Sequence, residues 1–222
     1  MADHLILIRS GPTEYEIQGR IRGTLDIPLA PAGTAVAEQA AALIAAPAVS
    51  ADMLAAAGAG TPAVPRPVAL VSAPDVASVE TARIVGRILG LRSRANDALA
   101  NLDQGLWQGM LVDDLRTKQP RLYRQWQDNP WSIAPPEGES LDEASARVEQ
   151  VLEGIGRRHR GGSVVVVVPP PLDRLVRWIV AGEALGDLWC TECPENPVAV
   201  LPMAAQWNRG RNPALRQVAA AR

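Results

Sequence analysis

The stretch Leu5-Ile6-Leu7-Ile8-Arg9-Ser10-Gly11-Pro12-Thr13-Glu14 decides the fold of this 222-residue chain. Its apolar first half is typical of a buried strand, and the run changes at once into Arg-Ser-Gly. In an open α/β sheet, buried strands end in this way where they deliver polar residues to a ligand-binding edge. The stretch therefore predicts a central strand with candidate site residues directly after it.

Strand and helix patterns alternate along the rest of the chain. A second buried strand is expected at 68–72, and further strands are expected at 163–168 and 198–201. The β-branched run at 163–168 is typical of a central strand covered on both faces. Helices are expected at 31–46, 76–89, 141–155 and 172–180. The third of these begins with capping-box spacing, Ser140 followed by Glu143. This order predicts a three-layer α/β/α sandwich with a mainly parallel sheet.

The composition favours one globular domain over residues 1–222, with an Ala/Gly/Pro-rich insertion at 47–66 and a less regular region at 96–136. The formal net charge of −2 argues against nucleic-acid or membrane-surface binding. No apolar run is long enough to span a bilayer, and no signal pattern opens the chain. We therefore expect a cytoplasmic protein, and the Ala- and Arg-rich composition suggests a GC-rich bacterial genome.

Five ordered segments resemble motifs of histidine phosphatases of the phosphoglycerate mutase-like superfamily. These segments are 9–16, 19–33, 72–82, 105–109 and 135–140. The resemblance extends over residues 4–180 and implies the phosphoglycerate mutase-like fold. In that family a neutral His attacks phosphorus, two Arg and a second His hold the phosphate oxygens, and a carboxylic acid protonates the leaving oxygen.

The positions that match these catalytic residues hold other side chains in this sequence. Only the first Arg is kept, as Arg9. Ser10 stands at the nucleophile position, Ala77 at the second Arg, Asn101 at the acid and Pro169 at the second His. Loss of the nucleophile alone costs a covalent-catalysis enzyme about 10⁶ in rate. The resemblance therefore predicts a pseudoenzyme with no confident catalytic residue.

Neither His of the chain is expected to replace the lost ones. His4 precedes the first strand, at the sheet edge opposite the expected pocket, and His159 lies in a basic helix end. Glu16 replaces a common Asn and brings negative charge to an anion site, where Arg9 can pair equally with Glu16 or with a ligand. The run 169–171 offers no backbone N–H to an anion.

Two hypotheses for function remain open. The first is a binding, scaffold or regulatory protein with a protein partner or a second copy of itself, or with a small molecule in the old phosphate cleft. The second is an enzyme with residual or altered phosphoryl chemistry, of the phosphatase or mutase kind. Ligand-binding candidates for either are Arg9, Ser10, Thr13, Glu16, Arg20, Asn101 and Trp107.

We expect no cofactor and no metal site. Cys190 and Cys193 have metal or redox spacing, but the chain has no other Cys to complete a zinc site, which favours an incidental pair. Four further tryptophans could belong to the core or to a partner surface, where Trp is enriched. They are Trp126, Trp131, Trp189 and Trp207.

Overall fold

The computed structural model describes residues 2–46, 65–190 and 196–203. Most of the predicted 47–66 insertion lies outside these ranges. The strands are β1 (His4–Arg9), β2 (Pro67–Ser72), β3 (Ser93–Ala95), β4 (Ser163–Val168) and β5 (Val198–Pro202). The helices are α1 (Glu14–Ile17), α2 (Pro31–Ala45), α4 (Val76–Leu89), α5 (Val112–Lys118), α6 (Pro120–Asp128), α7 (Leu141–Arg158) and α8 (Leu172–Ala181). Single 3₁₀ turns lie at η1 (Asp97–Leu99), η2 (Gly105–Trp107) and η3 (Pro130–Ser132).

The five strands form one sheet in the order β3-β2-β4-β1-β5. All neighbouring pairs are parallel except β1 with β5. Both β1 and β4 are buried along their whole length, which confirms the two central strands predicted from the apolar runs. The mainly parallel sheet of the prediction is also confirmed.

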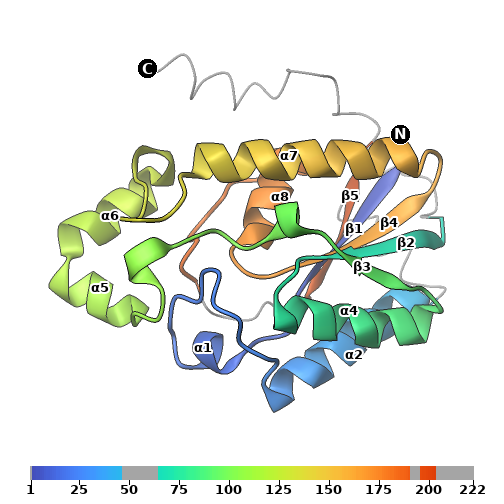
Figure 1. Cartoon of the computed structure of the whole chain (residues 1–222), viewed down its shortest axis with the longest axis horizontal. Coiled ribbons are helices and arrows are strands. Elements are labelled where there is room, and N and C mark those ends of the chain that lie inside the picture. The colour runs from blue at the N-terminus through green and yellow to red at the C-terminus, as the bar shows by residue number, and fades with distance from the viewer. Residues whose placement is uncertain (1, 47–64, 191–195, 204–222) are drawn as a thin grey trace.

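Helices cover both faces of the sheet, which gives the predicted three layers (Figure 1). On one face, α2 packs against α4, and Leu70 and Val165 lie in the core between these helices and the sheet. On the other face, α7 and α8 pack on a larger core that includes Leu7 and Val166. The alternation of side chains along each strand therefore divides the apolar residues between two cores.

Helix α7 begins where its sequence predicted. The Ser140 hydroxyl accepts from the Glu143 amide, and the Glu143 carboxylate accepts from Ser140 in return. These bonds from Ser140 lower the pKa of the Glu143 carboxyl. The helix buries the predicted face, with Leu141, Val148 and Leu152 among its core residues. Capping and periodicity are local signals, so the sequence was enough to place this helix.

Three expectations differ from the structure. The region 96–136 is more regular than predicted, because the short helices α5 and α6 form there and α6 buries Trp126. Strand β2 is only partly buried, and Val68 is 57% exposed. His4 lies inside β1 and does not precede it, although it is at the end of the strand away from the predicted site.

The tryptophans that could have formed a partner surface lie instead in or against the core. Trp126 and Trp189 are buried and stack with their ring centroids 4.8 Å apart, and Trp107 meets both edge-on. Trp131 packs against the same core from the side. Trp207 lies outside the described residues. No helix in the described ranges has the length and apolar character needed to cross a bilayer.

Acid is expected to destabilise the protein through His4. This side chain is buried, and its Nδ1 has no hydrogen-bond partner among the described residues. Burial lowers the pKa of His4 below its ordinary value of 6.5, and the Asp3 carboxylate opposes this only in part. The unfolded chain therefore takes up the proton first, and the free energy of unfolding falls as the pH drops below about 6.5.

The measurement is urea unfolding of the protein and of His4→Val at pH 8 and pH 5. The difference in unfolding free energy between the two proteins is expected to move in favour of the variant at pH 5. Comparing differences removes the contribution of other titrating groups that the two proteins share. Parallel losses in both proteins would contradict the assignment to His4.

Candidate functional site

The sheet brings the predicted site residues to one edge. Arg9 and Val168 are register partners at the carboxyl ends of the adjacent parallel strands β1 and β4, so Ser10 and Pro169 follow side by side. The Ser10 amide donates to the Val168 carbonyl at 2.9 Å. Ala77 lies in the first turn of α4, the helix that follows β2. Strand β2 pairs with β4 on the side opposite β1. This is the edge where open α/β sheets bind ligands.

A close approach of two backbones shapes this edge. Gly11 lies against the backbone of Gly33, and a Cβ at either position would collide with the other segment. The Gly11 amide donates to Thr81 Oγ1 at 3.1 Å, which ties the first loop to α4. Gly11 and Gly33 are therefore needed for packing, whatever the chemistry of the site.

Asn101 closes the site from the side of the irregular region. Its side chain is buried, and Nδ2 donates to the Gly23 carbonyl at 2.8 Å and to the Pro170 carbonyl at 3.0 Å. An amide held in this way joins two loops and has no acidic proton to give. The structure therefore brings Asn101 to the site as a structural link between loops.

A buried ion network takes the place of a contact between Glu16 and Arg9. Glu16 Oε1 lies 3.4 Å from Arg22 Nε, and Arg22 Nη2 lies 3.5 Å from Asp75 Oδ1. The second carboxylate oxygen of Glu16 accepts from the Thr13 amide at 2.8 Å and from the Thr13 hydroxyl. Glu16, one of the two partners considered for Arg9, is not paired with it, because Arg22 occupies the free oxygen of Glu16.

Arg9 is buried, and among the described residues its guanidinium forms no ion pair. Its main electrostatic influence is on Asp173 in the first turn of α8. Burial raises the pKa of the Asp173 carboxyl, while Arg9 and, more weakly, Arg174 and Arg177 act to lower it. The positive charge of Arg9 therefore favours the ionised form of this buried carboxyl.

Several polar atoms at this edge are buried without a hydrogen-bond partner in the described residues. They are Ser10 Oγ, Glu16 Oε1, the guanidinium nitrogens of Arg22, Asp75 Oδ2, Asn101 Oδ1 and Asp173 Oδ1. Two of these residues, Glu16 and Arg22, also line a cavity of about 30 Å³. One water needs about 10–15 Å³ of such space, so this cavity holds about two waters.

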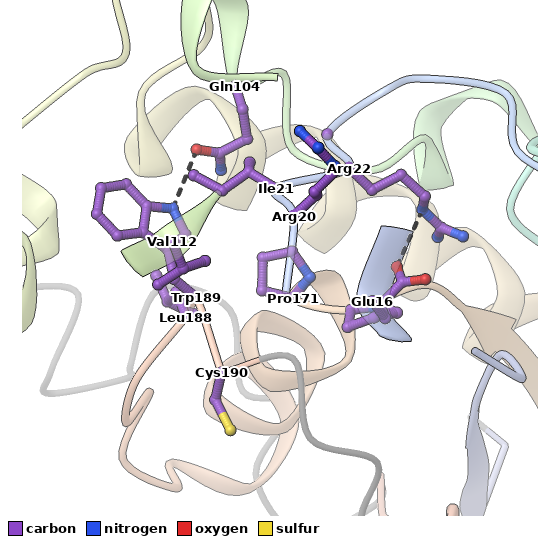
Figure 2. A pocket seen from close by; sticks show the side chains of 12 residues that line it. Glu16, Arg20, Ile21, Arg22, Gln104, Val112, Pro171, Leu188, Trp189 and Cys190 are labelled. Atoms are coloured by element: carbon purple, nitrogen blue, oxygen red, sulfur yellow. Dashed lines mark hydrogen bonds and ion pairs between the residues drawn. The ribbon is translucent and has the colours of Figure 1, made fainter. Parts of the chain in front are cut away.

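Figure 2 shows the walls of this cavity. Glu16 and Arg22 lie on one side as an ion pair, and Gln104 and Trp189 lie on the other, with Trp189 Nε1 donating to Gln104 Oε1 at 3.4 Å. Pro171 stands between the two groups. Because Glu16 and Arg22 are paired with each other and most of the lining is apolar, this cavity suits water or a small uncharged group better than an anion.

The remaining predicted ligand-binding residues have structural contacts. Thr13 is the N-cap of α1 and is fully buried. Arg20 lines the small cavity, but its Nη1 donates to the Gly109 carbonyl at 2.7 Å. Trp107 lies in the tryptophan cluster of the core and does not line this cavity. The structure thus brings Arg9, Ser10, Glu16 and Asn101 together and keeps Trp107 apart.

A protein-family model described as histidine phosphatase superfamily (branch 1) matches residues 5–206. The chain belongs to this superfamily. The resemblance drawn from the ordered motifs is therefore confirmed, and it covers the sheet, both helical layers and the whole edge described above.

Curated relatives in the superfamily include phosphatases and mutases. Phosphoserine phosphatase 1 of Hydrogenobacter thermophilus is 28% identical over 204 residues, which are 92% of this chain and 88% of the relative. A 2,3-bisphosphoglycerate-dependent phosphoglycerate mutase of Azorhizobium caulinodans is 31% identical over 168 residues, 70% of this chain and 72% of the relative.

Solved structures show the same fold. Bacillus stearothermophilus YhfR superposes with a TM-score of 0.71 at 22% identity, covering 90% of each chain. The mycobacterial glucosyl-3-phosphoglycerate phosphatase Rv2419c, in complex with VO3, superposes with a TM-score of 0.68 at 22% identity, covering 85% of this chain and 86% of that one. These likenesses establish the architecture of this histidine phosphatase superfamily member.

Sequence reasoning missed four residues of the site: Arg22, Asp75, Gln104 and Asp173. A signal existed for Arg22, because Gly19-Arg20-Ile21-Arg22-Gly23 places a second cation six residues after Glu16. Asp75 had the N-cap position of a predicted helix, where it accepts from the Ser78 amide. No local pattern marked Gln104 or Asp173, whose burial depends on packing between distant segments.

The cysteine pair stays a prediction. Cys190 lines the small cavity and is a free thiol in the structure, whereas Cys193 lies outside the described residues. Within the described ranges, no three His, Cys, Asp or Glu side chains gather as they would around a metal ion.

Proposed function

We propose that this member of the histidine phosphatase superfamily has no phosphoryl-transfer activity and acts by binding, as a scaffold or regulatory subunit. The observation that carries the proposal is the buried Glu16–Arg22–Asp75 network. In it two carboxylates neutralise Arg22, a buried cation of this edge. A phosphomonoester would have to displace these carboxylates and would gain little net charge attraction in return.

The chemistry of Ser10 supports the same conclusion. A serine hydroxyl becomes a nucleophile only with a base in hydrogen-bond reach. Ser10 Oγ has no hydrogen-bond partner among the described residues, and the neighbouring positions hold Pro169 and Ala77. Glu16 is not free to serve as base, because one carboxylate oxygen accepts from Thr13 and the other faces Arg22.

The alternative is residual or altered phosphoryl chemistry. It is favoured by the relatives, which include a phosphoserine phosphatase and a phosphoglycerate mutase. It would have to use Arg9, whose guanidinium forms no ion pair with a described residue, together with Ser10 and Asn101. An assay of aryl phosphate turnover decides between this alternative and the proposal above.

The test is turnover of a generic aryl phosphate by the purified protein, with Arg9→Ala as a contamination control and an active phosphatase as a positive control. Both proteins are expected to stay at the uncatalysed background, because nucleophile, acid and second Arg are all replaced, and loss of a nucleophile alone costs about 10⁶ in rate. Turnover that disappears in Arg9→Ala would refute the proposal and establish the enzyme.

Inorganic phosphate provides an independent binding test. Millimolar phosphate is expected to leave the melting temperature within about 1 °C of its value in chloride of equal ionic strength, since a ligand stabilises only the state that binds it. A larger rise that Arg9→Ala abolishes would show that the edge still binds phosphate.

A further inference from the structure

A second and much larger cleft lies away from the old phosphate site. It separates α7 from the part of the sheet that contains β2 and β3, and its volume is about 930 Å³. Its α7 wall runs from Arg147 to His159. At the helical rise of 1.5 Å per residue, this wall is about 18 Å long, or between three and four helical turns.

The floor of this cleft is an uncovered piece of a mainly parallel sheet. Leu70 packs toward the α2–α4 side, whereas Ala69 and Val71 face the α7 side and are only partly buried. Val68 at the entrance is 57% exposed. Val151 and Ile155 add apolar surface from α7. Parallel strands are normally covered on both faces, so this strip lacks the layer that α4 provides on the other side.

The charged side chains that line the cleft in the described residues are all basic. They are Arg92, Arg94, Arg147, Arg158 and, when protonated, His159. Arg147 is already paired with Glu139, at 2.5 Å. The other three arginines are exposed and form no ion pair with a described residue, although the chain as a whole carries a net charge of −2. The cleft therefore combines an apolar floor with unpaired cations.

We propose that this cleft binds an acidic amphipathic helix of a partner protein. An amphipathic helix supplies an apolar face of the right length for the floor and completes the missing helical layer. Acidic residues flanking that face would meet Arg92, Arg94 and Arg158. A second copy of this chain fits less well, because it would bring the same arginines into the contact.

This inference does not depend on whether the old phosphate site is active. The cleft shares no lining residue with the small cavity beside Glu16 and Arg22. Peptide binding and aryl phosphate turnover are separate measurements, so either proposal can fail alone. If both hold, the cleft is a partner surface for the scaffold or regulatory role.

The experiment titrates the full-length protein into a fluorescein-labelled peptide of about 14 residues, with leucines at i, i+3, i+4 and i+7 and glutamates on both flanks. Fluorescence anisotropy is expected to give a micromolar Kd that weakens about tenfold between about 50 and 300 mM NaCl. A scrambled peptide of the same composition is expected to bind at least about tenfold more weakly, because its leucines no longer share one face.

Variants test whether the peptide binds in the cleft beside α7. Arg92→Glu with Arg158→Glu, and separately Val68→Glu, are expected to weaken binding at least about tenfold. All three residues are exposed, so the variants should fold, and circular dichroism checks this. The matched control is Arg83→Glu with Arg87→Glu on α4, also exposed but on the other face of the sheet, with a change of less than about twofold.

Three outcomes would overturn the proposal. One is no binding of the leucine–glutamate peptide by a monomeric protein. Another is equal binding of the scrambled peptide or equal loss in the α4 control, which would mean nonspecific attraction. The third is a dimer in sedimentation that Val68→Glu dissociates, which would assign the cleft to a second copy of the chain.

Discussion

Replacing Arg22 with leucine is expected to lower the free energy of unfolding by about 3–5 kcal/mol. The Arg22 side chain is 1% exposed, and it is the cation that neutralises Glu16, whose side chain is 5% exposed. Removing one member of a buried ion pair leaves the other charge without compensation in a poorly solvated place. The effect is measured by urea unfolding, followed by tryptophan fluorescence.

A double variant shows whether the loss comes from the stranded charge. Arg22→Leu combined with Glu16→Gln is expected to recover part of the stability, because glutamine keeps the capping interaction with Thr13 and buries no charge at position 16, while Asp75 still lacks its cation. Arg116→Leu, which breaks an exposed pair with Asp113, serves as control and should cost less than about 1 kcal/mol. A loss for Arg22→Leu as small as this control would refute the role given to the network.

Replacing Arg147 with methionine is expected to cost about 3 kcal/mol. From α7 this guanidinium donates to the carbonyls of Ala98, Ala100 and Asn101, at 2.7–3.0 Å, and to both carboxylate oxygens of Glu139. It therefore fixes the segment that carries Asn101 to the site edge. Methionine keeps most of the packing of the stem but leaves three carbonyls and a carboxylate without this donor.

Arg147→Lys is expected to lower the free energy of unfolding nearly as much as Arg147→Met. Its three donors radiate from one nitrogen, whereas the five donors of the planar guanidinium are spread to reach every acceptor here. Arg157→Met on the same helix is the control, because its pair with Glu153 is exposed, and it should cost less than about 0.5 kcal/mol. Wild-type stability in Arg147→Lys would show that charge alone is sufficient. Unfolding by urea is again the measurement.

Those parts of the fold with strong local signals could be predicted from the sequence. The apolar runs predicted β1 and β4, and the capping box predicted the first residue of α7, which extends three residues beyond the predicted end. The short helices α5 and α6 were missed, since their sequences are polar and their order depends on Trp126 packing between Trp107 and Trp189. Such aromatic contacts join segments that are distant in sequence and leave no periodic pattern.

The sequence predicted which residues lie at the candidate site better than it predicted the contacts between them. Arg9, Ser10, Ala77, Asn101 and Pro169 do meet at the carboxyl edge of the sheet, because parallel strands end together. The partner of Glu16 could not be predicted in the same way. Two cations lay within reach along the chain, and the choice between them depends on loop geometry.

The sequence by itself determined the superfamily and the layered fold, because ordered motifs and local periodicity are properties of the chain. Only the tertiary structure decided that Arg22 and Asp75 surround Glu16, that the tryptophans are buried, and that a basic cleft stays open beside α7. Charge pairing, burial and unfilled space depend on how distant segments pack against one another. For this reason they can be determined only from the folded molecule.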